Sequence, residues 1–122
     1  MGGRGTFAIG NRVDFTYKTV GKIEGVKVLQ GLGIAHNLPE EAHSSKAYIK
    51  VDGKGNFVRY REYNEDKTSC FDIDYHKEPA LTVNKTDCIF HIHFYNNGVR
   101  DKIGRKLTSE EYDKYKKYFR GR

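Results

Sequence analysis

The stretch Cys88–Tyr95 constrains the fold most, because its apolar and polar side chains alternate one by one. Successive side chains of a β-strand point to opposite faces of a sheet, so this alternation is typical of a strand with one packed face. His91 and His93 then project side by side from the other face. The chain is therefore expected to build a sheet that buries apolar residues on one side and carries imidazoles on the other.

Other parts of the chain also have the composition of strands, with β-branched and aromatic residues between clusters of turn-forming residues. Strands are expected at residues 12–19, 22–29, 47–51, 57–63 and 68–75. Residues 31–39 hold two glycines, an asparagine and a proline, a composition typical of a loop. Together with the histidine-bearing strand, these segments predict an antiparallel sheet of about five strands.

A helix is expected near the C-terminus, where Thr108 and Glu111 have the spacing of a capping box. In that motif each of the two side chains accepts a hydrogen bond from the backbone N–H of the other residue. Tyr112, Tyr115 and Phe119 recur at helical spacing and would form the buried stripe of this helix. The predicted fold class is α+β, with a capped C-terminal helix packed on the antiparallel sheet.

The composition fits one small soluble domain, because 37% of the 122 residues are hydrophobic and 31% are charged. Residues 1–10 are interpreted as a flexible glycine-rich lead or linker, and residues 11–122 as a single α+β domain. No run of about 18 apolar residues occurs, so no membrane partner is expected. The two cysteines lack C-x-x-C spacing, which favours a reducing compartment.

The positive charge is concentrated towards the C-terminal end. The net charge is +6, and residues 96–122 carry nine basic and four acidic side chains. A domain that is basic at one end is suited to a polyanion, with nucleic acid favoured over a membrane. The alternative interpretation is a solvated basic tail that keeps the domain soluble.

The strand pattern places further functional groups on the face of the two histidines. A four-residue hairpin loop at 64–67 would pair the strands 57–63 and 68–75, setting Arg59 opposite Asp72 and Arg61 opposite Cys70. If the histidine strand packs beside this hairpin, one surface gathers three histidines, two aspartates and two arginines, namely His76, His91, His93, Asp72, Asp74, Arg59 and Arg61.

Such a surface suits cleavage of RNA by its own 2′-hydroxyl group. One imidazole removes the hydroxyl proton, a second protonates the leaving oxygen, and a guanidinium stabilises the charge that develops on the phosphate. The candidates are His91 and His93 as the acid–base pair, His76 as an assisting group, Arg59 and Arg61 as phosphate ligands, and Asp72 and Asp74 as orienting carboxylates.

Two other interpretations of the same residues stay open. The histidines can form the polar outer face of an ordinary half-exposed strand, with Arg59 and Asp72 as a cross-strand ion pair. His91 and His93 can also supply two imidazoles to a transition metal, with a nearby aspartate or His76 as a third ligand. This last interpretation describes a metal-binding structural domain.

Several short motifs follow one another in an order that resembles a known family. They are His36-Asn-Leu-Pro39, Ser44-Ser-Lys-Ala-Tyr48, Arg59-Tyr-Arg-Glu-Tyr63, Asp72-Ile-Asp-Tyr-His76, His91-Ile-His93 and Lys114-Tyr-Lys-Lys-Tyr-Phe119. Over Val26 to Phe119 the chain resembles the C-terminal domain of phage minor head (head-morphogenesis) proteins, and its motifs look like the C-terminal tips of polymorphic toxins. The resemblance implies a relationship to nucleases of the barnase, EndoU and RelE-like class.

The resemblance also implies metal-independent cleavage of RNA, without a cofactor. It adds His36 to His91, His93 and His76 as a catalytic candidate. The expected nucleic-acid contacts outside the sheet face are Lys46, Arg100, Lys102, Arg105 and Lys106.

The expected partners and location follow from the same resemblance. The chain is expected to act on nucleic acid, RNA in preference to DNA, as a phage-derived or toxin-type RNA-cleaving domain. A larger phage head protein that contains this domain, or an inhibitor protein, is a further expected partner, in the bacterial cytoplasm or the phage virion. The alternative function is a non-catalytic virion accessory or nucleic-acid-binding module of a phage head protein.

Overall fold

The structure is a computed structural model that describes residues 17–31, 37–42 and 44–122. Eight strands form one sheet in the order β1-β2-β3-β4-β5-β6-β7, and β8 also pairs with β6. The strands are β1 (Tyr17–Ile23), β2 (Val26–Gly31), β3 (Ala47–Val51), β4 (Phe57–Tyr63), β5 (Ser69–Lys77), β6 (Cys88–Asn96), β7 (Val99–Arg100) and β8 (Arg105–Lys106). The helices are η1 (Pro79–Leu81), α2 (Ser109–Tyr115) and η2 (Lys116–Tyr118).

The fold is α+β with a C-terminal helix, as the sequence predicts, but the sheet is larger than expected. The prediction of about five strands is wrong, because the described residues form eight. Two of them, β7 and β8, contain two residues each, which is too short for an alternation pattern to reveal them. The sheet is also not wholly antiparallel, since β2 and β3 pair in parallel.

A hairpin turn divides segment 22–29, which the sequence predicts as a single strand. Glu24 has a φ of 50° and Gly25 a φ of 83°, so both residues adopt the left-handed conformation. Two consecutive residues of this kind are typical of the tight turn that joins antiparallel strands. β1 therefore ends before this turn and β2 begins after it. Of the predicted strand 12–19, residues 12–16 lie outside the described residues.

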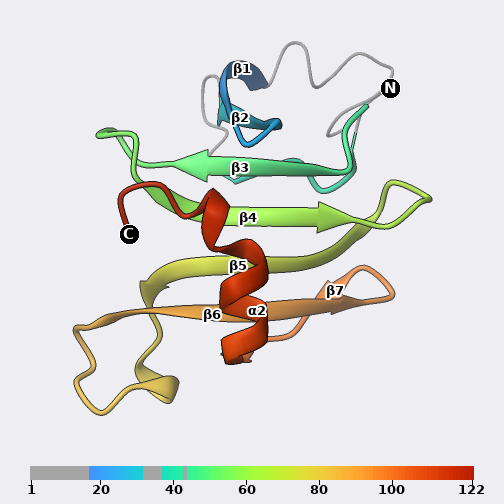
Figure 1. Cartoon of the computed structure of the whole chain (residues 1–122). Coiled ribbons are helices and arrows are strands. Elements are labelled where there is room, and N and C mark those ends of the chain that lie inside the picture. The colour runs from blue at the N-terminus through green and yellow to red at the C-terminus, as the bar shows by residue number, and fades with distance from the viewer. Residues whose placement is uncertain (1–16, 32–36, 43) are drawn as a thin grey trace.

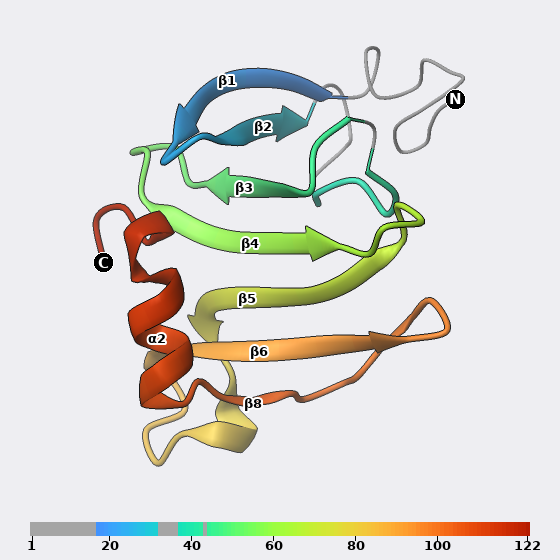
Figure 2. The same ribbon diagram turned by 45° about the vertical axis from the view of Figure 1, so that its right-hand side comes forward.

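The C-terminal helix begins as the sequence predicts. The hydroxyl oxygen of Thr108 accepts a hydrogen bond from the backbone N–H of Glu111 at 3.1 Å, and the Glu111 carboxylate accepts one from the N–H of Thr108 at 2.9 Å. This capping box satisfies N–H groups that the start of a helix leaves unpaired. The helices α2 and η2 then lie across one face of the sheet, as Figures 1 and 2 show.

The main core lies between these helices and the sheet. Phe57 is fully buried, and its ring centroid lies 4.7 Å from that of Phe119. Of the predicted helical stripe, Phe119 is buried, Tyr115 packs against the core, and Tyr112 keeps 37% of its surface exposed. The other buried members of this core are Ile23, Val28, Ala47, Ile49, Tyr60, Phe71, Ile73 and Ile92.

The opposite face of the sheet is divided into an apolar and a polar part. Leu29, Tyr48 and Tyr63 from the strands form a second buried cluster with Leu38 and Ala42 from the loop before β3. This cluster covers the face over β2, β3 and one end of β4. Over β4, β5 and β6 the rest of the face carries the polar side chains of the candidate site.

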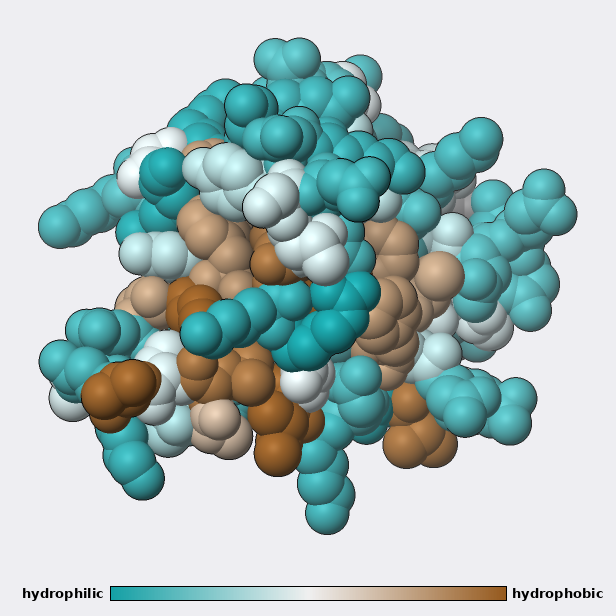
Figure 3. All heavy atoms as spheres, turned by 60° about the horizontal axis from the view of Figure 1, so that its bottom comes forward, coloured by the Kyte–Doolittle hydropathy of each residue, from teal (hydrophilic) through white to brown (hydrophobic). Residues whose placement is uncertain are grey.

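The surface at the β6–β8 end of the molecule is chemically mixed. Figure 3 shows apolar side chains there in separate patches among hydrophilic ones. The large exposed apolar residues of the described chain are Val20, Val83, Phe94, Val99, Ile103 and Tyr112. Cys70 and Cys88 are free thiols. None of the helices in the described part of the chain has the length and apolar character needed to span a bilayer.

Candidate functional site

The register of β4, β5 and β6 brings charged side chains together on the face opposite α2. Asp72 of β5 pairs with Arg61 of β4 on one side and with His93 of β6 on the other. Paired residues of neighbouring strands point to the same face, and residues two apart on a strand share it as well. The face therefore gathers Arg59, Arg61, Asp72, Asp74, His76, His91 and His93.

The register of the β4–β5 hairpin differs from the predicted one by two residues. Arg59 lies opposite Asp74 and Arg61 opposite Asp72, each two positions further along β5 than the sequence predicts. Tyr63 already pairs with Ser69 in place of Thr68, and the irregularity between Glu62 and Tyr63 adds the second residue of the offset. An even offset leaves every side chain on its predicted face, so the group of residues is preserved.

Arg61 is the structural centre of this face, and all five of its N–H groups have acceptors. Its Nε and Nη2 donate to the two carboxylate oxygens of Asp72 at 2.6 and 3.0 Å. Its Nη1 donates to the carbonyl oxygens of Leu38 and Pro39, and Nη2 also donates to the hydroxyl of Tyr95. Burial alone would lower the pKa of Arg61, but Asp72 raises it. With 4% of its surface exposed, Arg61 holds the loop before β3 and is not placed to bind a phosphate.

Asp74 is buried beneath two guanidinium groups and one imidazole. Arg59 donates to both of its carboxylate oxygens at 2.5 and 3.1 Å, and Arg100 donates to Oδ2 at 2.6 Å. His76 Nε2 lies 3.2 Å from the same oxygen. Burial would raise the pKa of Asp74, but His76, Arg59 and Arg100 hold it well below its usual range. Asp74 is therefore a fixed negative charge at the centre of the cluster.

The three histidines of the cluster are each oriented through Nδ1. An oxygen acceptor at this ring nitrogen assigns the proton of the neutral ring to Nδ1 and leaves the lone pair on Nε2. The acceptors are the carbonyl of Lys77 for His76, the carbonyl of Ile89 for His91 and the carboxylate of Asp101 for His93, each at 2.9 Å. Nε2 of each ring is thus left to face the cluster, with a lone pair in a neutral ring and as an N–H donor in a protonated one.

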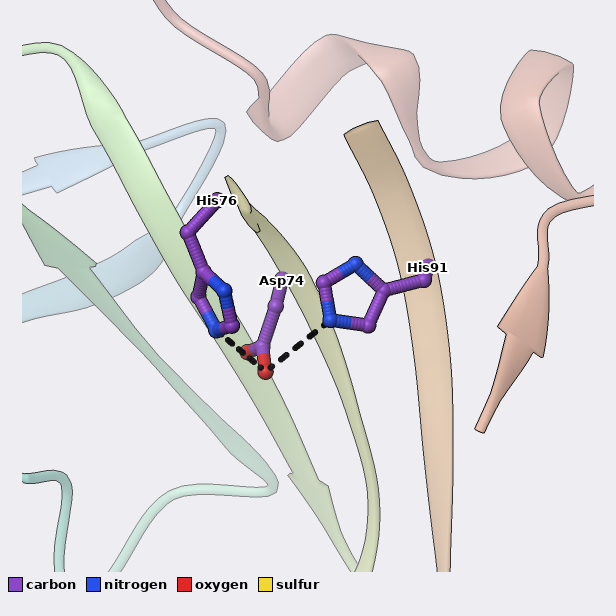
Figure 4. Close-up of side chains that lie close together, drawn as sticks. All are labelled: Asp74, His76 and His91. Atoms are coloured by element: carbon purple, nitrogen blue, oxygen red, sulfur yellow. Dashed lines mark ion pairs between the residues drawn. The ribbon is translucent and has the colours of Figure 1, made fainter. Parts of the chain in front are cut away.

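The three Nε2 atoms converge on one oxygen, Asp74 Oδ2. The separations are 3.2 Å for His76, 3.9 Å for His91 and 3.9 Å for His93. Figure 4 shows the rings of His76 and His91 on either side of this carboxylate. Among the described residues, Nε2 of His91 is buried and has no hydrogen-bond partner. The site therefore holds a buried, unpaired nitrogen that faces a cluster of charged groups.

His76 and His91 have opposite protonation preferences. The hydrogen bond to Asp74 raises the pKa of His76, whose side chain is 42% exposed. Burial lowers the pKa of His91, which is 0% exposed. The surroundings therefore favour a cationic ring at His76 and a neutral ring at His91, two states suited to an acid and a base.

The solvent-facing part of this surface is cationic. Arg100 keeps 31% of its side-chain surface exposed while it bonds to the two buried aspartates. Lys106 is exposed and pairs with His91 in the β6–β8 ladder, and Lys50 pairs with Arg59 in the β3–β4 ladder. The cationic side chains of this face therefore outnumber the two buried aspartates, and Glu78 and Asp101 add acidic groups beside the histidines.

A surface hollow of about 480 Å³ adjoins the cluster. Arg59, Tyr95 and Arg100 border it, together with Glu40 and Ser69. This volume is in the range of sites that hold small organic molecules or a nucleotide. A larger hollow of about 760 Å³ is lined by residues around β1, β2 and β3, and none of the clustered histidines lines either hollow.

Four other predicted site residues lie away from the cluster or outside the described chain. Lys46 borders a separate hollow with residues that pack under the C-terminal helix. Arg105 bonds to both carboxylate oxygens of Glu111 at 2.8 Å, on the helix side of the sheet. Lys102 is exposed in the loop between β7 and β8. His36 lies outside the described residues.

The sequence interpretation missed three residues at the site, Lys50, Glu78 and Asp101. The turn at 97–98 pairs Tyr95 with Arg100, so Asp101 returns beside the histidine strand. The turn sequence Asn97-Gly98 predicts a hairpin that would place Asp101 at the site, and the alternation of side chains within β3 predicts the face of Lys50. Glu78, whose carboxylate lies within 4.8 Å of the ligand nitrogens of two histidines, follows the end of β5 and has no periodic signal.

Comparisons with known proteins add no second line of argument. Neither a family model, nor a curated protein, nor a solved structure matches the chain. What the site does is therefore argued from its own geometry and charge. The resemblance to phage head and toxin nuclease domains stays a prediction from the sequence motifs.

Proposed function

We propose that this domain cleaves RNA by acid–base catalysis on the face formed by β4, β5 and β6, without a metal or another cofactor. One observation carries the proposal. Two neighbouring imidazoles, with ring centroids 4.8 Å apart, both present Nε2 to the same point, and their surroundings shift their pKa values in opposite directions. The partly exposed guanidinium of Arg100 bonds to the same oxygen of Asp74 that both rings face.

The roles follow from exposure and protonation. His91 accepts the proton of the ribose 2′-hydroxyl, and the resulting oxygen attacks phosphorus. His76 donates a proton to the departing 5′-oxygen as the P–O5′ bond breaks. The products are a 2′,3′-cyclic phosphate and a 5′-hydroxyl end. This assignment gives the acid role to His76 in place of His93, because the hydrogen bond to Asp74 raises the pKa of His76 and its side chain is 42% exposed.

Arg100 is the phosphate ligand in this proposal, in place of the fully bonded Arg61. Its guanidinium bridges Asp72 and Asp74 at the surface. It bonds to the same oxygen of Asp74 that Nε2 of His91 faces, so a phosphate held by Arg100 would lie beside the histidine cluster. Lys106 extends the cationic surface along β8 and would contact the next phosphate.

The wider setting of this function rests on the motif resemblance. A phage-derived or toxin-type domain of this kind would act on RNA in the bacterial cytoplasm, or belong to a larger phage head protein in the virion. An inhibitor protein would protect the producing cell. The second candidate is a non-catalytic nucleic-acid-binding module, which is favoured by the deep burial of His91 and His93.

The test is cleavage of end-labelled RNA by the purified chain in EDTA. We expect cleavage by the wild type, and a loss of at least about 100-fold for His76→Ala, because general acid–base groups contribute that much. Arg105→Gln is the matched control, since Arg105 lies on the helix side, and its rate should be unchanged. His91→Ala should also lose activity, with its circular dichroism and urea midpoint measured to separate catalysis from folding.

Two outcomes would contradict the proposal. If the wild type leaves RNA intact but binds it with strong salt dependence, the second candidate is correct. If His76→Ala cleaves RNA as fast as Arg105→Gln does, the acid is a different group.

A further inference from the structure

We infer that Asp74, His76 and His91 form a binding site for a divalent transition metal, with Zn²⁺ as the best match. The binding itself does not depend on the proposed function. Its consequence rests on that function, because the metal would occupy the nitrogens that acid–base catalysis uses. The site would then make RNA cleavage sensitive to zinc, although the cleavage itself needs no metal.

The first argument is the spacing of the candidate ligand atoms. One oxygen of Asp74 and one nitrogen of each histidine all lie within 4.8 Å of one another. Asp74 Oδ2 is 3.2 Å from Nε2 of His76 and 3.9 Å from Nε2 of His91 (Figure 4). Ligand atoms at about 2.0–2.1 Å from a tetrahedral zinc ion are roughly 3.3 Å apart. Small side-chain movements therefore bring the three atoms to zinc-binding distances.

The second argument is the unpaired nitrogen of His91. This ring is 0% exposed, and among the described residues its Nε2 has no hydrogen-bond partner. A buried polar atom without a partner destabilises the folded protein, so a ligand that pairs with it is favoured. The atom faces Asp74 and the ring of His76. Carboxylate and imidazole groups are common metal ligands in proteins.

The third argument is the way each ring is held. Metal-binding histidines commonly donate the other ring N–H to a carbonyl or carboxylate, which fixes the tautomer and the direction of the lone pair. Nδ1 of His76 faces the carbonyl of Lys77, and Nδ1 of His91 faces the carbonyl of Ile89, both at 2.9 Å. The two rings are therefore already oriented as zinc ligands.

Further ligands are available beside these three residues. Glu78 and His93 form a second group with His91, and their ligand atoms also lie within 4.8 Å of one another. A zinc ion on His91 could therefore complete a four-coordinate shell with protein atoms. A water molecule or a substrate oxygen is the other possible fourth ligand.

The neighbouring arginines lower the affinity of the site for zinc. Arg59 and Arg100 both bond to Asp74, and their positive charge opposes a divalent cation. The domain also has an extensive hydrophobic core between the sheet and the helices, whereas a zinc finger depends on its metal to fold. We therefore infer reversible binding that is weaker than at a structural zinc site, as expected of an inhibitory ion rather than a folding cofactor.

The test measures Zn²⁺ binding to the full chain without RNA, by competition with a chromogenic zinc chelator. We expect one zinc ion per chain, and an affinity at least about tenfold lower in His76→Gln, because even residues behind the metal ligands change affinity by that factor. Lys77→Gln is the matched control at the next position and should bind as the wild type does. In ¹⁵N spectra of the imidazoles, zinc should shift Nε2 of His91 and leave Nδ1 protonated.

The proposed zinc site would be contradicted if the chain did not bind zinc stoichiometrically. It would also be contradicted if His76→Gln and Lys77→Gln bound zinc with equal affinity. Because RNA is absent from this measurement, its failure is independent of the cleavage experiment. A second arm adds Zn²⁺ to the cleavage assay, where we expect inhibition that EDTA reverses. Zinc binding without inhibition would overturn the regulatory consequence alone.

Discussion

Arg61 and Asp72 face each other across β4 and β5 with both side chains buried, and the guanidinium bonds to both carboxylate oxygens. Their pairing joins three parts of the molecule, because Arg61 also holds the carbonyl groups of the loop before β3 and Asp72 accepts from Arg100 of β7. The pair therefore has a structural role, because it holds together the elements that carry the histidine cluster, and it takes no part in the proposed catalysis.

We expect Arg61→Met to destabilise the domain by about 3–5 kcal/mol, because it leaves the buried charge of Asp72 without its main partner. Urea unfolding followed by circular dichroism measures this change. Lys116→Met is the control, since Lys116 pairs with Asp113 at 3.5 Å with both side chains exposed. An exposed pair of this kind contributes about 0–1 kcal/mol. Equal losses of stability in the two variants would contradict the structural role of the buried pair.

Gly104 and Gly98 provide a second matched comparison. Both have a positive φ, 78° and 79°, so alanine at either position costs roughly 1–2 kcal/mol in backbone strain. A β-carbon at Gly104 would also lie 2.3 Å from the carbonyl oxygen of Ile92 and 3.1 Å from Nδ1 of His93, whereas Gly98 has open space. We expect Gly104→Ala to lose about 1–3 kcal/mol more than Gly98→Ala in urea unfolding, as overpacking does. Equal losses would contradict the close approach of this turn to β6.

Phe57 tests the packing of the C-terminal helix on the sheet. It is fully buried, and its ring lies against those of Phe90 and Phe119. We expect Phe57→Ala to lower the free energy of unfolding by about 3–5 kcal/mol, because it leaves a large cavity in the core. Val83 is fully exposed, so Val83→Ala should change it by less than about 0.5 kcal/mol. A small effect at Phe57 would mean that the helix does not pack on the sheet as described.

Glu111 gives a pH-dependent prediction. Its hydrogen bond with Arg105 lowers the pKa of Glu111 from the ordinary value of 4.5 to about 2. A carboxylate with a lowered pKa in the folded state stabilises the protein above its unfolded value, and this stabilisation disappears as the pH falls from about 4.5 towards 2. We expect Glu111→Gln to cost about 1 kcal/mol at pH 7, since glutamine keeps the cap but loses the charge.

The same substitution should cost almost nothing near pH 2, where the wild-type carboxylate becomes protonated. Unfolding curves of both proteins at the two pH values measure the difference. Glu110→Gln is the control, because Glu110 is the exposed neighbour in the first turn and should show only a weak effect through the helix dipole. A cost for Glu111→Gln that is independent of pH would contradict the assigned ion pair.

The faces of the strands could be predicted from the sequence, because side chains alternate with a period of two. This rule predicts that Asp72 and Asp74 share a face with His91 and His93, and the β5–β6 ladder pairs them in that way. The same rule was insensitive to the two-residue offset of the β4–β5 hairpin, since an even shift preserves the faces. The sequence therefore predicts which residues belong to the cluster, but it does not predict which residue of β4 lies opposite which residue of β5.

Features that depend on loops could not be predicted in this way. The carbonyl groups that fill the hydrogen-bonding capacity of Arg61 belong to Leu38 and Pro39, in a loop without periodicity. The sequence therefore assigned Arg61 to phosphate, although its donors are all engaged inside the protein. The division of segment 22–29 into two strands likewise depends on the backbone angles of Glu24, a residue type that seldom adopts them.

The central claim is that the clustered histidines cleave RNA through its 2′-hydroxyl group without a metal. The most direct measurement incubates the chain in EDTA with an RNA and with the same sequence carrying 2′-O-methyl groups, and analyses the ends of the products. The account predicts cleavage of the RNA to 2′,3′-cyclic phosphate and 5′-hydroxyl ends, and an intact 2′-O-methyl strand. Equal cleavage of both strands, or cleavage only after a metal is added, would contradict it.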